Sequence, residues 1–157
     1  MKFNMDEWSQ EIIDAKERRN LPVLYFPCLS LTNMGIIETV MEGRKMAETM
    51  AAAIEKYPSM IAAMTGMDLS VDSEAFGAEV VFKENAVPSA HKPVVKTAED
   101  IKALKVPDVH SGRVDIFLDA VVEAQKLITD RPVFGGQLGP FSLAANLLKV
   151  QDALMMT

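Results

Sequence analysis

Short apolar segments alternate with longer amphipathic ones along this chain, and this alternation constrains the fold more than any other feature. Three apolar segments, at residues 21–29, 60–64 and 132–136, are rich in β-prone residues and lie next to proline or glycine. Between them, apolar residues recur at the three- and four-residue spacing of helices. Buried parallel strands joined by helical crossovers have this pattern. The sequence therefore predicts an α/β fold with about three parallel strands.

The segments between these strands have their own local signals. Helical spacing is found in residues 6–19, 37–57, 71–76, 97–104, 114–128 and from about residue 141 onward. Gly77 is well placed to end the helix before it in a left-handed conformation. Thr97 and Asp100 have the spacing of a capping pair. Residues 79–83 alternate as a strand does, and residues 84–96 are expected to form an excursion or a hairpin.

Three parallel strands cannot form a closed barrel. A (β/α)8 barrel needs eight strands and about 250 residues, whereas this chain has 157. An open parallel sheet exposes the hydrogen-bonding edges of its outer strands. Thr157 follows no helix cap, basic last turn or polar tail. We therefore expect residues 1–157 to be one portion of a larger fold that self-associates or pairs with the missing part.

Composition excludes several classes of function. Apolar residues make up 49% of the chain, charged residues 24%, and the formal net charge is -6, which argues against a nucleic-acid partner. The single cysteine excludes a disulfide within the chain. The polar N-terminus lacks the apolar region of a signal peptide, and the apolar runs fall well short of the ~20 residues that span a membrane. A reducing, cytoplasmic location is expected.

Asp68 is the first candidate for chemistry. It follows the apolar segment at residues 60–64, and ligands of α/β sheets bind beyond the carboxyl ends of the strands. A carboxylate there can accept hydrogen bonds from a substrate or transfer a proton, but it can equally be a helix N-cap. Asp72 and Glu74, on the next turn, are weaker candidates, because Asp72 suits a helix N-terminus and Glu74 suits solvent.

The segment from Gly135 to Ser142 is the second candidate. Its glycines lie between a strand and a helix, where backbone N–H groups can bind an anion, although glycines also serve tight turns. Cys28, His91 and His110 are too far apart in sequence to suggest a metal site. Cys28 is more typical of a small buried hydrophobic residue, and both histidines are expected at the surface.

Asp68 to Val80, with the sequence DLSVDSEAFGAEV, resembles a segment of the uroporphyrinogen decarboxylase superfamily. The resemblance is closer to its cobamide-dependent methyltransferase branch, and Phe82–Pro88 and Gly139–Ala145 agree with that branch too. It implies the N-terminal portion of a TIM-like barrel, with Asp68 at the position of the aspartate that binds pyrrole N–H groups in the decarboxylases. Asp68 is thus the catalytic candidate, and Asp68, Glu74, Gly139 and Phe141 are the substrate-binding candidates.

One departure favours methyl transfer. The decarboxylases carry an arginine-rich motif after the first strand, and residues 26–32 of this chain, FPCLSLT, contain no arginine. The methyltransferase branch implies a methylated corrinoid protein as donor, a thiol such as coenzyme M as acceptor, and a zinc ion. Its zinc ligands belong to the second half of the barrel, so none is assigned here, and this chain alone is expected to be inactive.

Two alternatives stay open. One is a portion of a uroporphyrinogen decarboxylase with a tetrapyrrole substrate, in which Asp68 would gather the pyrroles. The other is a half-barrel without catalytic activity that only associates with other chains.

Overall fold

The computed structural model of the chain describes residues 3–148 and 150–155. Its helices are α1 (Met5–Asp14), the short 3-10 helix η1 (Phe26–Cys28), α2 (Leu29–Thr32), α3 (Ile36–Val40), α4 (Gly43–Lys56), α5 (Val71–Ala75), α6 (Ala98–Ala103), α7 (Val114–Leu127), α8 (Pro140–Leu147) and α9 (Val150–Met155). Its strands are β1 (Ala63–Met64), β2 (Val80–Lys83), β3 (Ala86–Ala90) and β4 (Val133–Phe134).

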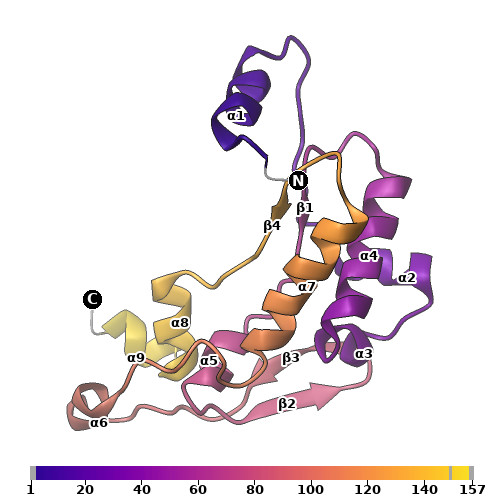
Figure 1. The fold of residues 1–157 in the computed structure, drawn as a ribbon. Helices are drawn as coiled ribbons and strands as arrows, with labels where there is room; N and C mark the ends of the chain where they lie inside the picture. The colour runs from indigo at the N-terminus through magenta and orange to yellow at the C-terminus, as the bar shows by residue number, and fades with distance from the viewer. Residues whose placement is uncertain (1–2, 149, 156–157) are drawn as a thin grey trace.

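Strands β1 and β4 form the parallel pair at the centre of the fold (Figure 1). Ala63 lies opposite Val133 and Met64 opposite Phe134. The Thr65 backbone N–H donates to Phe134 O at 3.1 Å, which extends the pairing beyond β1. Two of the three predicted parallel segments, residues 60–64 and 132–136, are thereby confirmed. The described residues form an α/β structure with a parallel sheet and no closed barrel.

The predicted strand at residues 21–29 is wrong. Residues 26–28 form η1, and α2 follows directly from it. Pro22 and Pro27 have no N–H to donate to a ladder, and Pro27 suits the first turn of a helix. One parallel bridge, between Asn20 and Met60, remains beside β1, where the Ile61 N–H donates to Asn20 O at 3.0 Å. The segment therefore passes beside the sheet without becoming a strand in it.

Helices α4 and α7 pack side by side and carry most of the core (Figure 1). Small residues let them approach closely. A Cβ added at Gly43 would lie 2.6 Å from Ile116 O and 2.8 Å from Ala120 N, so only glycine fits there. Ala120 and Ala124 of α7 are fully buried. The predicted helix at 114–128 is confirmed, whereas the one at 37–57 is interrupted at residues 41–42 and forms α3 and α4.

The other local predictions are largely confirmed. Helix α5 ends before Gly77, whose φ of 90° lies in the left-handed region. Thr97 and Asp100 form the predicted capping box of α6. The N-terminal helix α1 is shorter than predicted and ends at Asp14.

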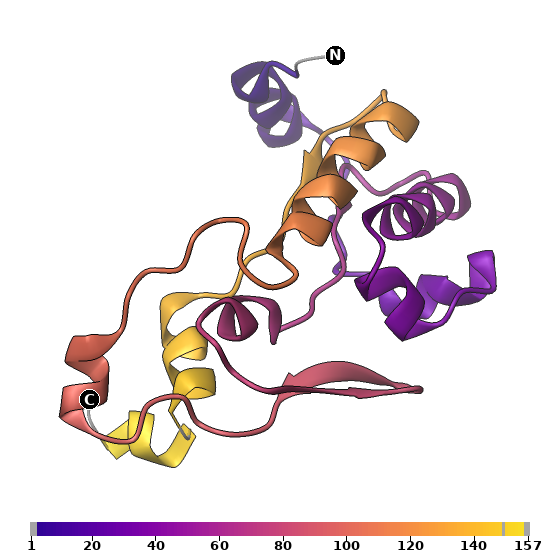
Figure 2. The same ribbon diagram turned by 60° about the horizontal axis from the view of Figure 1, so that its bottom comes forward.

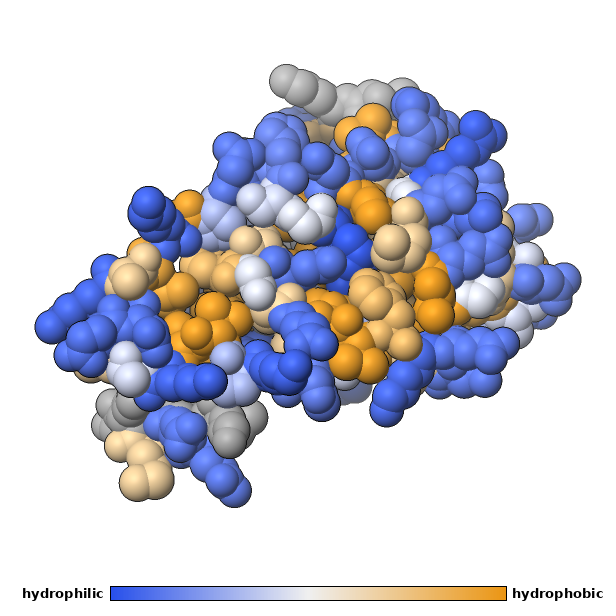
Figure 3. Space-filling view, turned by 90° about the horizontal axis from the view of Figure 1, so that it is seen from below, coloured by the Kyte–Doolittle hydropathy of each residue, from blue (hydrophilic) through white to orange (hydrophobic). Residues whose placement is uncertain are grey.

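Residues 80–90 form the antiparallel hairpin of β2 and β3, which extends to the lower right in Figure 2. Phe82 and Val87 are 38% and 36% exposed there. In the view from below, apolar side chains reach the surface between polar ones (Figure 3).

Candidate functional site

A cavity of ≈ 310 Å³ lies beyond the carboxyl ends of β1 and β4. This is the place where the sequence predicted a ligand site. One wall is the N-terminal half of α7, and the opposite wall is formed by the segments that follow the two strands. The lining residues are Thr65, Gly66, Met67, Asp68, Leu69, Val71, Asp72, Val114, Phe117, Leu118, Val121, Gly135, Gly136, Gln137 and Leu138. Most of them are apolar, and none is a lysine, arginine or histidine.

Asp68 lies in the lining, but its side chain is fully buried, with an exposed fraction of 0%. Its Oδ1 accepts hydrogen bonds from the backbone N–H of Ser70 at 2.9 Å and from Ser70 Oγ at 2.6 Å. Its Oδ2 accepts from Arg113 Nη1 at 2.6 Å. Ser70 is the residue that precedes α5, so Asp68 is not the N-cap of that helix. The carboxylate is therefore held by groups of the protein itself.

Arg113 is the centre of this polar cluster. Its Nε donates to Glu74 Oε2 at 2.6 Å, its Nη2 to Ser70 Oγ at 2.8 Å, and its guanidinium carbon lies 4.9 Å from the centroid of the Phe82 ring. The side chain is only 4% exposed. The arginine thus connects the segment after β1, helix α5, helix α7 and the hairpin.

Arg113 lies at the N-terminus of α7, a position that is unfavourable for a positive charge. It directly precedes α7, where the helix dipole favours negative charge. Two carboxylates, Asp68 and Glu74, offset that repulsion. Gly112, with a φ of 59°, turns the chain so that the arginine reaches them. Sequence reasoning missed Arg113, although a glycine and an arginine directly before a long helix were an available signal.

A second set of contacts fixes the segment that follows β4. The Gly136 N–H donates to Thr65 Oγ1 at 2.8 Å, and the Leu138 N–H donates to Asp72 Oδ2 at 3.2 Å. These two backbone donors, which the sequence suggested for an anion, are thus already bound inside the protein. Asp72 has a defined role here, since it ties the start of α5 to the segment after β4.

The other candidate residues lie in different places. Glu74 shares Arg113 with Asp68 but does not line the cavity. Gly139 directly precedes α8. Phe141 lies in the first turn of that helix and is 54% exposed. Neither residue lines the cavity. Substrate-binding roles for Glu74, Gly139 and Phe141 therefore remain predictions.

Cys28 is buried, as expected, and burial raises the pKa of its thiol. His91 and His110 are exposed, also as expected. The Asp115 carboxylate, 2.6 Å from His110 Nδ1, raises the pKa of that imidazole. In the described part of the chain, no three His, Cys, Asp or Glu side chains gather as metal ligands would.

Tyr25 packs against Gly66, one of the residues that line the cavity. Its ring is buried against the backbone of Gly66, where an added Cβ would lie 2.7 Å from Tyr25 Cδ1. Burial raises the pKa of Tyr25 to about 12. A side chain at residue 66 would push the turn that leads to Asp68 away from this ring.

The sequence of this chain matches a known protein family. The model of the uroporphyrinogen decarboxylase (URO-D) family matches residues 28–157. The chain therefore belongs to the uroporphyrinogen decarboxylase family, as its sequence motifs indicated.

Individual relatives refine this placement. The chain is 30% identical over 141 residues to the methylcobamide:CoM methyltransferase MtbA of Methanosarcina acetivorans, an alignment that covers 82% of this chain and 42% of that protein. It is also 30% identical over 97 residues to a uroporphyrinogen decarboxylase of Pseudomonas fluorescens, which covers 61% of this chain and 27% of the relative. The chain thus spans less than half the length of these relatives.

A solved structure shows the same fold. A methyltransferase from Methanosarcina mazei superposes with a TM-score of 0.77 at 21% identity, covering 99% of this chain and 48% of that one. Within residues 3–148 and 150–155, no helix combines the length and apolar character needed to cross a membrane.

Proposed function

We propose that residues 1–157 are the N-terminal portion of a corrinoid-dependent methyltransferase, which moves a methyl group from a methylated corrinoid protein to a thiol. The observation that carries this proposal is the similarity to methylcobamide:CoM methyltransferase MtbA over 82% of the chain. In the reaction, the sulfur–carbon bond forms as the cobalt–carbon bond breaks, and the thiol proton is released. We expect the protein to act in the cytoplasm.

The charges near the cavity support methyl transfer over decarboxylation. A porphyrinogen carries many carboxylates, and these require cationic partners. No cationic side chain lines the cavity, and the segment of η1 and α2 contains none. The nearby Arg113 is already paired with Asp68 and Glu74. A poly-anionic substrate would therefore find no partner in this portion of the site.

The apolar wall of α7 suits a methyl-transfer site. Val114, Phe117 and Val121 would exclude water from the methyl group and from the attacking sulfur. Asp68, held by Ser70 and Arg113, fixes the turn at the carboxyl end of β1 on which the opposite wall depends. We expect Asp68 to act in this way, through the geometry of the site.

The zinc ion that the family resemblance implies does not fit the described residues of this chain. The one cysteine, Cys28, is buried, and no cluster of three ligand side chains exists in residues 3–148 and 150–155. We therefore assign no metal-dependent step to this portion. The ligands of the zinc ion are expected to come from the remainder of the barrel.

A uroporphyrinogen decarboxylase is the second candidate, because relatives with that activity cover 61% of the chain. In that case Asp68 would have to exchange Arg113 for pyrrole N–H groups.

The test is to express the longest reading frame that contains residues 1–157 and to measure two reactions. We expect methylation of 2-mercaptoethanesulfonate by methylcobalamin, zinc in the purified protein and no decarboxylation of uroporphyrinogen. Decarboxylation without methyl transfer would replace our proposal with the second candidate. A pure, folded assembly with neither activity would favour a half-barrel that only associates with other chains.

A further inference from the structure

The segment between β4 and α8 is bound at two points to the segment that follows β1. The Gly136 N–H donates to Thr65 Oγ1 at 2.8 Å. The Leu138 N–H donates to Asp72 Oδ2 at 3.2 Å. These two donors lie on either side of Gln137, so the backbone of that residue is restricted in both directions. The position of the Gln137 side chain is therefore set by two side chains of another segment.

Gln137 lines the cavity, and its carboxamide has no hydrogen-bond partner among the described residues. The other polar side chains of the lining are already engaged. Asp68 is bound by Arg113, and Thr65 and Asp72 accept the two backbone donors. Gln137 therefore offers a bound molecule one acceptor, Oε1, and the two N–H donors of Nε2.

The cavity around Gln137 suits a small molecule with one polar end. A Cβ added at Gly135 would lie 3.5 Å from Val121 Cγ2, so this segment lies against the apolar wall of α7. The volume of ≈ 310 Å³ is at the lower end of the range of small-molecule cavities, about 300–1,000 Å³. A ligand with a polar head group and a short apolar body matches the carboxamide and the apolar wall.

We propose that Gln137 recognises the head group of the acceptor thiol by donating a hydrogen bond from Nε2 to an anionic oxygen, as in the sulfonate of 2-mercaptoethanesulfonate. A carboxamide has N–H donors and no charge of its own that would repel an anion. Thr65 is a positioning residue in this scheme, because it holds the peptide group beside Gln137. Further donors to the head group are expected from the remainder of the barrel. The inference rests on the proposed function, since it assigns a residue to the thiol of that reaction.

The test uses the longest reading frame that contains residues 1–157, with methylcobalamin as the methyl donor and three thiols as acceptors. The thiol 2-mercaptoethanesulfonate has an anionic head group, 1-propanethiol has an apolar end, and cysteamine has a cationic head group. KM and kcat are measured for each thiol. We expect the parent protein to have its lowest KM for 2-mercaptoethanesulfonate.

Gln137→Leu removes both polar groups of the side chain and keeps a similar volume. We expect it to raise the KM for 2-mercaptoethanesulfonate about tenfold, the effect of one hydrogen bond to a charged group, and to change the KM for 1-propanethiol much less. Gln137→Glu should raise the KM for 2-mercaptoethanesulfonate further and lower that for cysteamine, because the new carboxylate repels the anion and attracts the amine. Thr65→Val should raise the KM for 2-mercaptoethanesulfonate in the parent protein but not in the Gln137→Leu background, because Thr65 acts through Gln137.

The matched control is Gln125→Leu, the same substitution at an exposed position of α7 outside the cavity, which should leave the three KM values unchanged. If the parent protein methylates thiols but Gln137→Leu keeps the preference for the anionic head group, the role of Gln137 is refuted and methyl transfer stands. If Gln137→Leu raises the three KM values equally, Gln137 has a structural role and the inference also fails. A parent protein that methylates no thiol would refute the proposed function itself, and this inference with it.

Discussion

Replacing Arg113 with methionine tests whether the buried ion cluster stabilises this portion of the fold. Methionine fills similar space but leaves two carboxylates without their cation. The Asp68 side chain is 0% exposed and that of Glu74 is 24% exposed, so water cannot replace the guanidinium at Asp68. Removing one partner of a buried ion pair typically costs about 3–5 kcal/mol. We expect Arg113→Met to lower the free energy of unfolding by about that amount.

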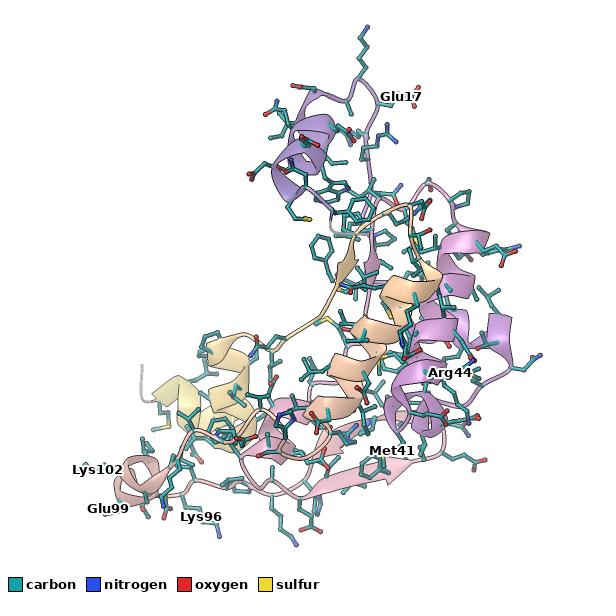
Figure 4. The ribbon with its side chains drawn as sticks, viewed as in Figure 1. Glu17, Met41, Arg44, Lys96, Glu99 and Lys102 are labelled. Carbon is teal, nitrogen blue, oxygen red and sulfur yellow. The ribbon has the colours of Figure 1, made fainter. Side chains whose placement is uncertain are left out.

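The assay is equilibrium unfolding in urea, followed by circular dichroism, together with thermal melting. For a domain of this size a loss of 1 kcal/mol lowers Tm by about 2–4 °C, so the variant should melt roughly 6–20 °C below the parent protein. Arg44→Met is the matched control. Arg44 pairs with Glu48 at 3.2 Å on the surface of α4 (Figure 4), its side chain is 73% exposed, and its loss should be too small to resolve.

The double variant Asp68→Asn, Arg113→Met separates charge from packing. It removes the carboxylate together with its partner, so it should be more stable than Arg113→Met alone. Two results would refute charge pairing as the source of stability. One is that Arg113→Met is no less stable than Arg44→Met. The other is that adding Asp68→Asn to Arg113→Met lowers the free energy of unfolding by as much as Asp68→Asn does alone.

Two further predictions concern the α4–α7 contact and the start of α7. Gly43→Val should lower the free energy of unfolding, measured in urea, by about 1–3 kcal/mol, because its Cβ would lie 2.6 Å from Ile116 O. Gly35→Ala is the control, since a Cβ added there meets no atom within 4 Å. Equal losses for the two variants would refute the close contact. By NMR titration His110 should have a pKa above its ordinary value of 6.5, and Asp115→Asn should remove most of the increase, because Asp115 is its main cause and Asp108 adds to it. Because the pKa of His110 is raised in the folded protein, its pairing with Asp115 stabilises the fold below about pH 6.5, and this contribution is lost as the pH rises through the pKa of folded His110. A pKa of His110 at its ordinary value would refute the contact.

The parts of the fold that the sequence predicted correctly have strong local signals. Helix α7 follows from apolar residues at helical spacing, and Gly77 from the need for a left-handed turn after α5. The parallel pairing of β1 and β4 follows from two short apolar segments joined by a long crossover. The helix and the turn were carried by a short stretch of sequence, and the strand pairing by two such stretches about seventy residues apart.

The failures arise where two prolines or a distant partner decide the structure. The segment at residues 21–29 is apolar enough for a strand, but Pro22 and Pro27 cannot donate to a ladder. Asp68 was correctly placed at the end of β1, yet its partner Arg113 lies 45 residues further on and has no spacing relation to it. The availability of a carboxylate to a ligand depends on such partners, which a linear pattern does not reveal.

The pairing of β1 with β4 has a consequence for synthesis of the chain. Ala63 must wait for Val133, about seventy residues later, before its neighbour in the sheet exists. A ribosome that adds about 5–20 residues per second needs roughly 4–14 seconds for that interval. During this time the nascent chain carries an unpaired strand and the apolar side of α4, without the α7 residues Ala120 and Ala124 that later cover it. Chaperones that bind exposed apolar segments therefore have a defined interval in which to act on this protein, and codon choice between β1 and β4 sets its length.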